Sequence, residues 1–272
     1  IAGLALPVLL IPPLAGCAAY ALGYWLPMAV LWAGALPAFV GALGLNYALE
    51  GRQKRYLKNA FRQYLSPVVI DQLVAHPDRL RLGGEEKELT IFFSDVQGFT
   101  SISEKLDPTR LTEFLNTYLT AMTDTLLAEG ATIDKYEGDA IIAFWNAPTD
   151  QSDHAQRGVR AALRCQSILA EKRDEWTARF GSPIFMRVGM NTGRVVVGNM
   201  GSNQRFDYTF LGDAGNLAAR LEGINKKFGT YFMISEATRN RLGADFRGRE
   251  ISRITVVGRR EAVRVFEPVT EE

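Results

Sequence analysis

The stretch TIFFSDVQGFTSIS, residues 90–103, places one aspartate at the end of an apolar run. Ile91, Phe92 and Phe93 are the β-branched and aromatic residues that a buried strand prefers. Asp95 follows at once, and Gly98 then allows a tight turn. Asp95 is therefore either the cap of a following helix or a carboxylate that faces a ligand where the strand leaves the core.

A second carboxylate stands in DKYEGDAIIAFWNAP, residues 134–148. Asp139 follows Gly138 between two apolar strands, which is a hairpin position where an aspartate is commonly a turn former. If the hairpin lies beside the first strand, Asp95 and Asp139 come close together and repel each other unless a cation lies between them. Hard divalent ions such as Mg²⁺ fit that arrangement, and two-metal sites support in-line displacement at phosphorus.

From residue 88 onward the pattern alternates between strands and helices, which predicts an α+β sandwich. The expected strands are residues 89–94, 132–136, 140–145, 185–192, 194–199, 208–211, 251–257 and 263–267, and the expected helices are residues 108–129, 151–180, 212–228 and 235–242.

The first 49 of the 272 residues contain no Asp, Glu, Lys, Arg or His, although the whole chain has a net charge of only +1. About 20 apolar residues cross a bilayer, so the segment predicts two transmembrane helices, at residues 2–22 and 27–49. A cleaved signal peptide and a buried soluble hairpin are the alternatives. The small net charge gives no pull toward nucleic acid, and no nucleic-acid partner is expected.

A basic cluster follows the apolar segment directly, which by the positive-inside bias predicts a cytoplasmic catalytic domain anchored in the cell (inner) membrane. Its members are Arg52, Lys54, Arg55, Lys58 and Arg62. Residues 50–87 are expected to form a juxtamembrane helix and a linker, either paired in a dimer or solvated. Because the first residue is Ile, we expect a fragment that lacks an upstream extracytoplasmic sensor domain.

Cysteine and histidine are too sparse for a disulfide framework or a histidine-based zinc site. Cys17 and Cys165 lie far apart, and so do His76 and His154, for which surface or loop positions are expected.

Four motifs together resemble the successive signatures of class III nucleotidyl cyclases, in order and with ordinary spacing, from about residue 88 to residue 267. They are FFSDVQGFTSISE (92–104), DKYEGDAIIAFWNAP (134–148), RVGMNTGRVVVGNMGS (187–202) and DYTFLGDAGNLAARLEGIN (207–225). The resemblance implies that residues 88–272 form a ferredoxin-like class III cyclase domain.

The resemblance also assigns roles at the phosphate end of the site. Asp95 and Asp139 match the two metal-binding aspartates, and Val96 is placed with them, which implies two Mg²⁺ or Mn²⁺ ions per active site. The backbone at Gly98, Phe99 and Thr100 matches the turn that cradles the triphosphate.

Further positions match family residues that contact the nucleotide. Arg194 corresponds to a phosphate-binding arginine, Asn216 to the asparagine that orients the ribose, and Arg220 to the arginine that stabilises charge on the α-phosphate. Taken alone, Arg194 is equally a surface charge and Arg220 a solvated arginine on an amphipathic helix. Lys135 and Thr209 match the base-reading pair, and the lysine favours ATP over GTP.

Two features distinguish this chain from many relatives. Threonine at 209 places it with the class IIIb subgroup, some of whose members respond to bicarbonate, so bicarbonate sensitivity is a hypothesis. In ITVVGRREAV, residues 254–263, Val257 stands where relatives carry a first phosphate-binding lysine, and Arg259 stands at the second. Arg259 is either a replacement phosphate ligand or a surface arginine.

The resemblance thus implies an adenylyl cyclase for signal transduction, a homodimer whose two sites are each shared between protomers. The ribose 3′-oxygen of ATP would attack its own α-phosphorus and give cyclic AMP and pyrophosphate. The alternatives are a guanylyl cyclase, a diguanylate cyclase, a non-catalytic cyclase-homology module and a membrane-anchored structural domain. The complete set of acidic, basic and base-reading residues favours the adenylyl cyclase.

Overall fold

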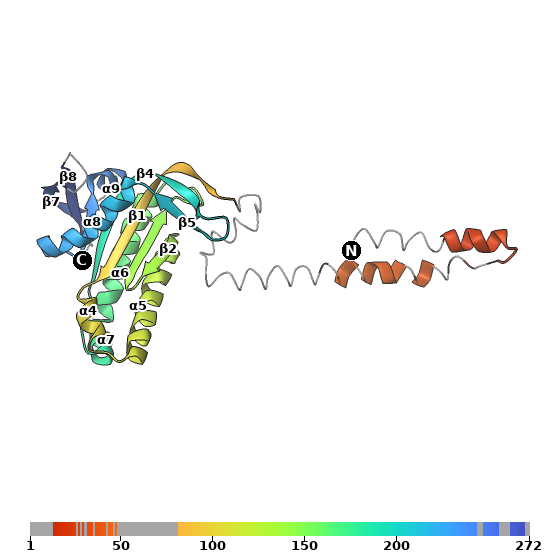
Figure 1. The fold of residues 1–272 in the computed structure, drawn as a ribbon, viewed down its shortest axis with the longest axis horizontal. Helices are drawn as coiled ribbons and strands as arrows, with labels where there is room; N and C mark the ends of the chain where they lie inside the picture. The colour runs from red at the N-terminus through yellow and green to blue at the C-terminus, as the bar shows by residue number, and fades with distance from the viewer. Residues whose placement is uncertain are drawn as a thin grey trace. The chain divides into compact units, whose positions relative to one another are not determined.

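The chain divides into two units, residues Ile1–Leu65 and Ser66–Glu272, which are described separately (Figure 1). The structure is a computed structural model, and it describes residues 13–25, 27, 29, 32–34, 36–41, 43–45, 47, 81–243, 247–255 and 262–269. The predicted boundaries at 49/50 and 87/88 stay a prediction.

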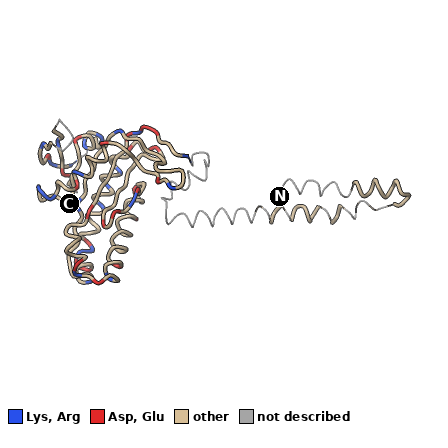
Figure 2. The backbone as a smooth tube through the Cα atoms, in the orientation of Figure 1, with Lys and Arg blue, Asp and Glu red and all other residues tan. Residues whose placement is uncertain are grey.

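The first unit contains a helix at residues 13–21 and further helical residues between 29 and 47. Its described part carries no Lys, Arg, Asp or Glu (Figure 2). Among the residues that the structure describes, no helix is both long and apolar enough to cross a membrane. Both predicted spans, at residues 2–22 and 27–49, include residues outside the described ranges, and they stay a prediction. The basic cluster at 52–62 and the linker up to residue 80 lie outside the described residues.

The described part of the second unit forms an eight-stranded mixed sheet, in the order β2-β3-β1-β4-β6-β8-β7 with β5 paired to β4. The strands are β1 (Gly83–Val96), β2 (Thr132–Glu137), β3 (Ala140–Trp145), β4 (Met186–Gly201), β5 (Phe206–Leu211), β6 (Phe232–Ser235), β7 (Gly248–Ile254) and β8 (Val263–Pro268). The helices are α4 (Phe99–Ser103), α5 (Pro108–Ala128), α6 (His154–Glu171), α7 (Arg173–Phe180), α8 (Asp213–Phe228) and α9 (Glu236–Arg241).

Alternate residues of β1 belong to two different cores, because successive side chains of a strand point to opposite faces. Phe92 and Val96 pack with residues of α5, α6 and α7 in the larger core. Leu89 and Ile91 pack with residues of α8 in a second core, against which side chains of β5 also pack. The sheet is thus covered on both faces, which confirms the predicted α+β class.

Local signals in the sequence explain several element boundaries. Asp107 caps α5 by accepting hydrogen bonds from the backbone amides of Thr109 and Arg110, both at 3.0 Å, and Pro108 stands at the first helical position. The β2–β3 turn uses Gly138 at φ 65°, a left-handed conformation that favours glycine. The predicted hairpin at 132–145 is confirmed within one residue.

Two predictions about individual elements were wrong, and one short strand was not predicted. Residues 185–192 and 194–199 were expected as two strands, but β4 is continuous because Gly193 stays in the ladder opposite Leu89. The expected helix at 151–180 is divided into α6 and α7, for which we have no physical account. The four-residue β6 was not predicted because so short an apolar run has no clear period.

His154 was also placed wrongly, since it is buried rather than on the surface. Its Nδ1 lies 2.7 Å from the Thr90 hydroxyl, which in turn lies 2.8 Å from the Thr192 hydroxyl. Burial lowers the pKa of His154, while the neighbouring Glu88 carboxylate opposes the change. Cys17 and Cys165 are both free thiols.

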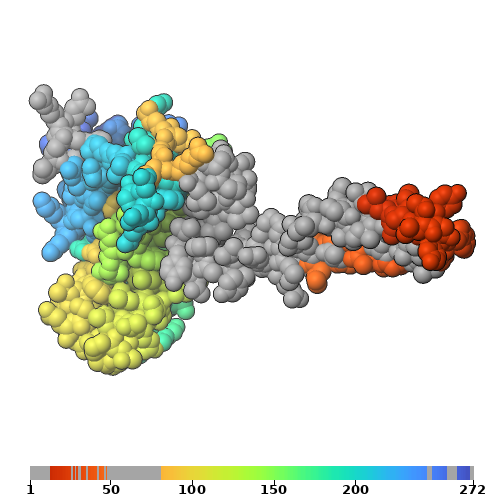
Figure 3. Space-filling view, turned by 45° about the vertical axis from the view of Figure 1, so that its right-hand side comes forward, coloured from red at the N-terminus to blue at the C-terminus, as the bar shows by residue number. Residues whose placement is uncertain are grey.

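Helix α8 lies directly on β4, and the two are seen beside each other in Figure 3. The approach depends on Gly189: a Cβ there would lie 2.1 Å from the Glu222 amide nitrogen and 2.3 Å from the Ala218 carbonyl oxygen. Both neighbours are backbone atoms of the helix, so they cannot rotate away. Gly189 therefore fixes how closely α8 packs on the sheet.

We expect Gly189→Ala to lower the free energy of unfolding by about 3 kcal/mol, because the added methyl group forces the helix off the sheet. The matched control is Gly223→Ala on α8, where an added Cβ meets nothing within 4 Å. That variant should gain up to about 1 kcal/mol from helix propensity. Urea unfolding of both variants measures the difference, and equal stabilities would contradict the close-packing argument.

Candidate active site

The two aspartates that the sequence singled out lie at the same end of neighbouring strands. Strand β1 pairs with β3 up to Ser94 opposite Ile141. Asp95 comes directly after Ser94, and Asp139 comes directly before β3, so the two aspartates lie at the same end of these antiparallel strands. The Val96 amide donates a hydrogen bond of 2.9 Å to Oδ2 of Asp139 and holds that carboxylate at the end of β1. Asp95 caps no helix, since α4 begins after Gly98.

Repulsion and burial both act on this acidic pair. Burial raises the pKa of Asp139 to about 6, and the neighbouring Asp95 carboxyl adds to the rise while the Val96 amide opposes it. Asp139 is only 8% exposed, whereas Asp95 is half-buried. A cation between the two carboxylates would relieve this cost.

Arg187 on β4 supplies one positive charge to the pair. Its Nη2 donates to Oδ2 of Asp95 at 2.8 Å, and its Nε donates to Oε1 of Glu222 on α8 at 3.1 Å. The Arg187 and Glu222 side chains are only 15% and 17% exposed. Burial raises the pKa of Glu222 to about 6, with the Asp95 charge adding to it and Arg187 opposing. The guanidinium thus ties a predicted metal ligand to helix α8.

The predicted phosphate-binding turn follows the acidic pair. Gly98 has φ 71°, in the left-handed region that favours glycine. Phe99 is half-buried and stacks on Phe114 with ring centroids 6.3 Å apart, while Thr100 is exposed. The chain therefore anchors the turn on one aromatic side chain and leaves its polar side in solvent.

The predicted phosphate-binding arginine, Arg194, extends from β4 into solvent. Its side chain is 77% exposed, and it reaches Glu86 at 3.3 Å. It borders a cavity of about 270 Å³ that Asn191, Asp213 and Ser235 also line. Arg259, the other arginine predicted to bind phosphate, lies outside the described residues.

Asn216 and Arg220 lie one helical turn apart on α8, as predicted. Asn216 is exposed and Arg220 is half-buried. The Nη1 atom of Arg220 is buried without a hydrogen-bond partner among the residues that the structure describes. A buried guanidinium nitrogen without an acceptor is costly, and an anionic ligand would supply one.

The structure places Lys135 and Thr209 on β2 and β5, two strands that are connected by a side-chain hydrogen bond. Thr209 Oγ1 donates to Oδ2 of Asp134 at 3.0 Å, and Asp134 immediately precedes the exposed Lys135. Within the described ranges, no hydrogen bond or ion pair joins Lys135, Thr209, Asn216 or Arg220 to the acidic pair. The chain thus presents two groups of predicted site residues, an acidic one and a base-reading one.

Asp134 and Arg187 contact predicted site residues, and Glu222 contacts Arg187, but none of the three was predicted. A signal did exist for Arg187, because a charge within an apolar strand needs a partner. Nothing local identifies that partner, since Asp95 is 92 positions away in sequence.

The donor set fits a hard divalent ion, although it is incomplete within one chain. Carboxylate oxygens are the ligands that Mg²⁺ prefers, usually one or two of them with substrate phosphates and water. Asp95 and Asp139 supply such a pair. In the described part of the chain, no group of three or more His, Cys, Asp or Glu could hold a metal ion. Substrate phosphates and water usually complete such a coordination shell.

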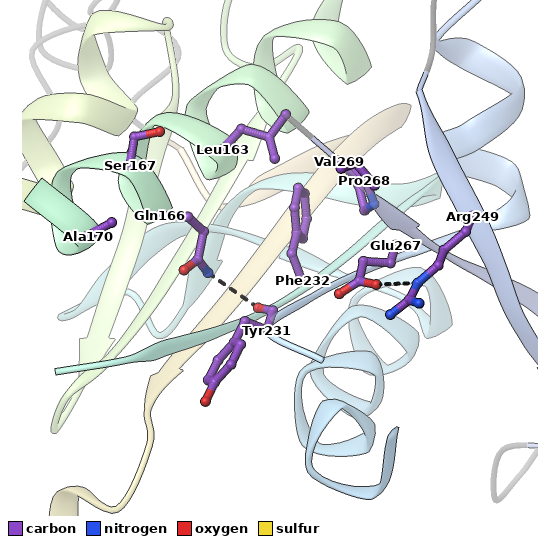
Figure 4. A pocket seen from close by; sticks show the side chains of 10 residues that line it. All are labelled: Leu163, Gln166, Ser167, Ala170, Tyr231, Phe232, Arg249, Glu267, Pro268 and Val269. Atoms are coloured by element: carbon purple, nitrogen blue, oxygen red, sulfur yellow. Dashed lines mark hydrogen bonds and ion pairs between the residues drawn. The ribbon is translucent and has the colours of Figure 1, made fainter. Parts of the chain in front are cut away.

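A larger groove of about 570 Å³ lies between α6 and the β6–β8–β7 edge (Figure 4). Gln166 donates to the Tyr231 carbonyl across it at 3.3 Å, and Arg249 pairs with Glu267 at 2.7 Å. None of the predicted site residues lines this groove. Size alone therefore does not mark it as the active site.

Comparison with known proteins points to one family. The family model described as the adenylate and guanylate cyclase catalytic domain matches residues 84–266. An adenylate cyclase of Anabaena cylindrica is 33% identical over 219 residues, which are 79% of this chain and 42% of that protein. Adenylate cyclase 1 of Rhizobium meliloti is 34% identical over 184 residues, 67% of this chain and 28% of that protein. The chain thus spans less than half the length of these relatives.

Solved structures agree on the fold of the second unit. The adenylyl cyclase CyaB from P. aeruginosa superposes with a TM-score of 0.65 at 34% identity, covering 70% of this chain and 98% of that one. The guanylyl cyclase Cya2 gives a TM-score of 0.62, also at 34% identity, covering 68% of this chain and 93% of that one. Equal identity to cyclases of both kinds means that overall similarity does not decide between ATP and GTP.

We expect Arg187→Met to lower the free energy of unfolding by about 2 kcal/mol, because Asp95 and Glu222 lose their shared cation in a poorly solvated place. Adding Glu222→Gln to that variant should recover part of the loss, since one uncompensated carboxylate is removed. Thermal or urea unfolding checks both. If Arg187→Met alone is as stable as the parent chain, the ion pairs of Arg187 with Asp95 and Glu222 do not contribute to the free energy of unfolding.

Proposed function

This chain belongs to the adenylate and guanylate cyclase catalytic-domain family, and we propose that it is an adenylyl cyclase that converts ATP to 3′,5′-cyclic AMP and pyrophosphate. The observation that carries the proposal is the carboxylate pair at one end of β1 and β3, where the Val96 amide holds Asp139 and the Arg187 guanidinium holds Asp95. A buried Asp139 carboxylate beside a half-buried Asp95 carboxylate costs free energy, and binding of a metal–triphosphate complex would account for the pair.

In this proposal Asp95 and Asp139 hold two Mg²⁺ or Mn²⁺ ions. When bound, these ions supply Lewis acidity that favours ionisation of the ribose 3′-hydroxyl and neutralises the triphosphate. The turn at Gly98 receives the phosphates. Arg194 was predicted to bind them as well, but it stands opposite Glu88 while Arg187 stands opposite Asp95, so it lies seven residues along the β1–β4 ladder from the acidic pair. The 3′-oxygen then forms a bond to the α-phosphorus as the bond from that phosphorus to the pyrophosphate oxygen breaks.

Helix α8 stabilises the charge that develops during this displacement. The Arg220 guanidinium meets the α-phosphoryl oxygens, a role supported by its buried Nη1 atom without a partner among the described residues. Asn216, one turn earlier, orients the ribose so that the 3′-oxygen is in line with the leaving group. Lys135 and Thr209 select the base.

The two groups of residues would meet in a homodimer, where the acidic group of one protomer faces the base-reading group of its partner. An exposed apolar strip supports this part of the proposal. Val196 on β4 and Leu211 on β5 lie directly opposite each other and are 43% and 63% exposed. A twofold arrangement would cover this strip and complete two equivalent sites.

The cellular setting remains a proposal from sequence. The apolar residues 1–49 suggest attachment of the cytoplasmic catalytic unit to the cell membrane, downstream of a sensor.

We expect the purified chain to form cyclic AMP from ATP with Mg²⁺ or Mn²⁺, and little cyclic GMP from GTP, as product chromatography can measure. Asp139→Ala should abolish turnover because one metal ligand is lost. A cooperative urea-unfolding transition should show that the variant is still folded. Asp124→Ala, which removes an exposed carboxylate on α5, should keep the parent rate. A parent-like rate for the Asp139 variant would refute the metal assignment.

Shared sites predict complementation between two inactive variants. Arg220→Met should lower kcat by about 100-fold through lost transition-state stabilisation. In a heterodimer of this variant with Asp139→Ala, one site carries both changes and the other carries neither. An equal mixture should therefore recover roughly a quarter of the parent activity if subunits exchange freely. No recovery in co-expressed, co-purified heterodimers would place all residues of one site on a single chain.

A further inference from the structure

Asp134 stands at a β-bulge beside the base-reading lysine. Strand β2 pairs Ile133 with Ala143 and Lys135 with Ile142, so Asp134 is an extra residue without a partner in the β3 ladder. A bulge breaks the strict alternation that would put residues 134 and 135 on opposite faces, and bulges are frequent beside active sites. The irregularity therefore frees Asp134 to serve a tertiary contact.

That contact fixes the hydroxyl group of Thr209. Thr209 Oγ1 donates to Oδ2 of Asp134 at 3.0 Å, across 75 positions of sequence. A hydroxyl group has one donor hydrogen and two acceptor lone pairs, whereas a carboxylate only accepts. With its hydrogen given to Asp134, Thr209 retains only lone pairs for a ligand.

The carboxylate is held there at a cost. Its other oxygen, Oδ1, is buried and has no hydrogen-bond partner among the described residues. Burial raises the pKa of Asp134, and the Lys135 ammonium and the Thr209 hydroxyl oppose the rise. A buried polar atom left without a partner calls for an explanation beyond stability, because an apolar side chain would fill the same space at lower cost.

The chemistry of the two purines supplies that explanation. Adenine presents an exocyclic amine, which donates, where guanine presents O6, which accepts. A threonine free to rotate could serve either base. A threonine that can only accept binds the adenine amine and leaves guanine O6 facing lone pairs. Lys135, a donor only, suits the N1 acceptor of adenine and opposes the N1–H of guanine.

We propose that Asp134 is a specificity-determining positioning residue, which locks the Thr209 hydroxyl as a hydrogen-bond acceptor and thereby selects adenine over guanine. The inference rests on the proposed function, since it assumes that Lys135 and Thr209 face the base.

The test measures binding of 3′-deoxy-ATP and 3′-deoxy-GTP to the full chain with Mg²⁺. Both nucleotides lack the attacking oxygen and cannot be cyclised, so binding is separated from turnover. We expect the parent chain to favour the adenine nucleotide, and Asp134→Ala to reduce the ratio of the two affinities about tenfold, mainly through tighter binding of the guanine nucleotide. The kcat/KM ratio for ATP over GTP should fall in parallel.

Two matched variants identify the route of the effect. Asp207→Ala removes an exposed carboxylate two residues from Thr209 on the same strand and should keep the parent ratio. Thr209→Val removes the hydroxyl at nearly constant shape. In that background Asp134→Ala should have no further effect on the ratio, because Asp134 acts only through the hydroxyl. Asp134→Leu keeps the volume of the site and replaces Asp134→Ala if the latter does not fold.

The outcomes separate this inference from the proposed function. A parent chain that favours adenine, with a ratio unchanged in Asp134→Ala or Asp134→Leu, overturns the role of Asp134 alone. So does an effect of Asp134 that persists without the Thr209 hydroxyl, or an equal effect of Asp207→Ala. A parent chain that favours guanine, or that binds neither nucleotide, overturns both this inference and the adenylyl cyclase proposal.

Discussion

The antiparallel pairing of β1 with β4 is the contact on which the rest of the domain depends. It runs without a register shift from Gly83 opposite Asn199 to Val96 opposite Met186. Because the side-chain period of a strand is two, a slip of one residue between the two strands would put Asp95 and Arg187 on opposite faces of the sheet. The register therefore fixes both the core and the position of the acidic pair.

The carboxylates of Asp95 and Asp139 repel each other when no cation lies between them, and the surrounding structure reduces that repulsion. The Val96 amide and the Arg187 guanidinium each offset part of the carboxylate charge. Since Arg187 also binds Glu222, the same cation connects β1, β4 and α8. Gly189, two residues further along β4, allows the helix to approach closely enough for this bridge. Packing and electrostatics thus act on the same contact.

The base-reading group, on β2 and β5, is likewise held by packing together with one polar contact. Strand β5 pairs antiparallel with the C-terminal part of β4, and its residues Tyr208 and Phe210 pack against Phe144. This packing brings Thr209, between the two aromatic residues, within hydrogen-bonding distance of Asp134. The aromatic contacts supply the stability, and the polar contact between them would supply the selectivity.

The sequence by itself determined the elements whose signals are local. The hairpin around Asp139, the capped helix α5 and the helix carrying Asn216 and Arg220 all follow from period, caps and turn residues, and four motifs identified the family. Only the tertiary structure decided that β4 is one strand, that Arg187 joins Asp95 to Glu222, and that Asp134 holds Thr209. Propensity and periodicity act within a few residues, whereas these contacts join residues 35 to 92 positions apart, and their partners are chosen by register and packing.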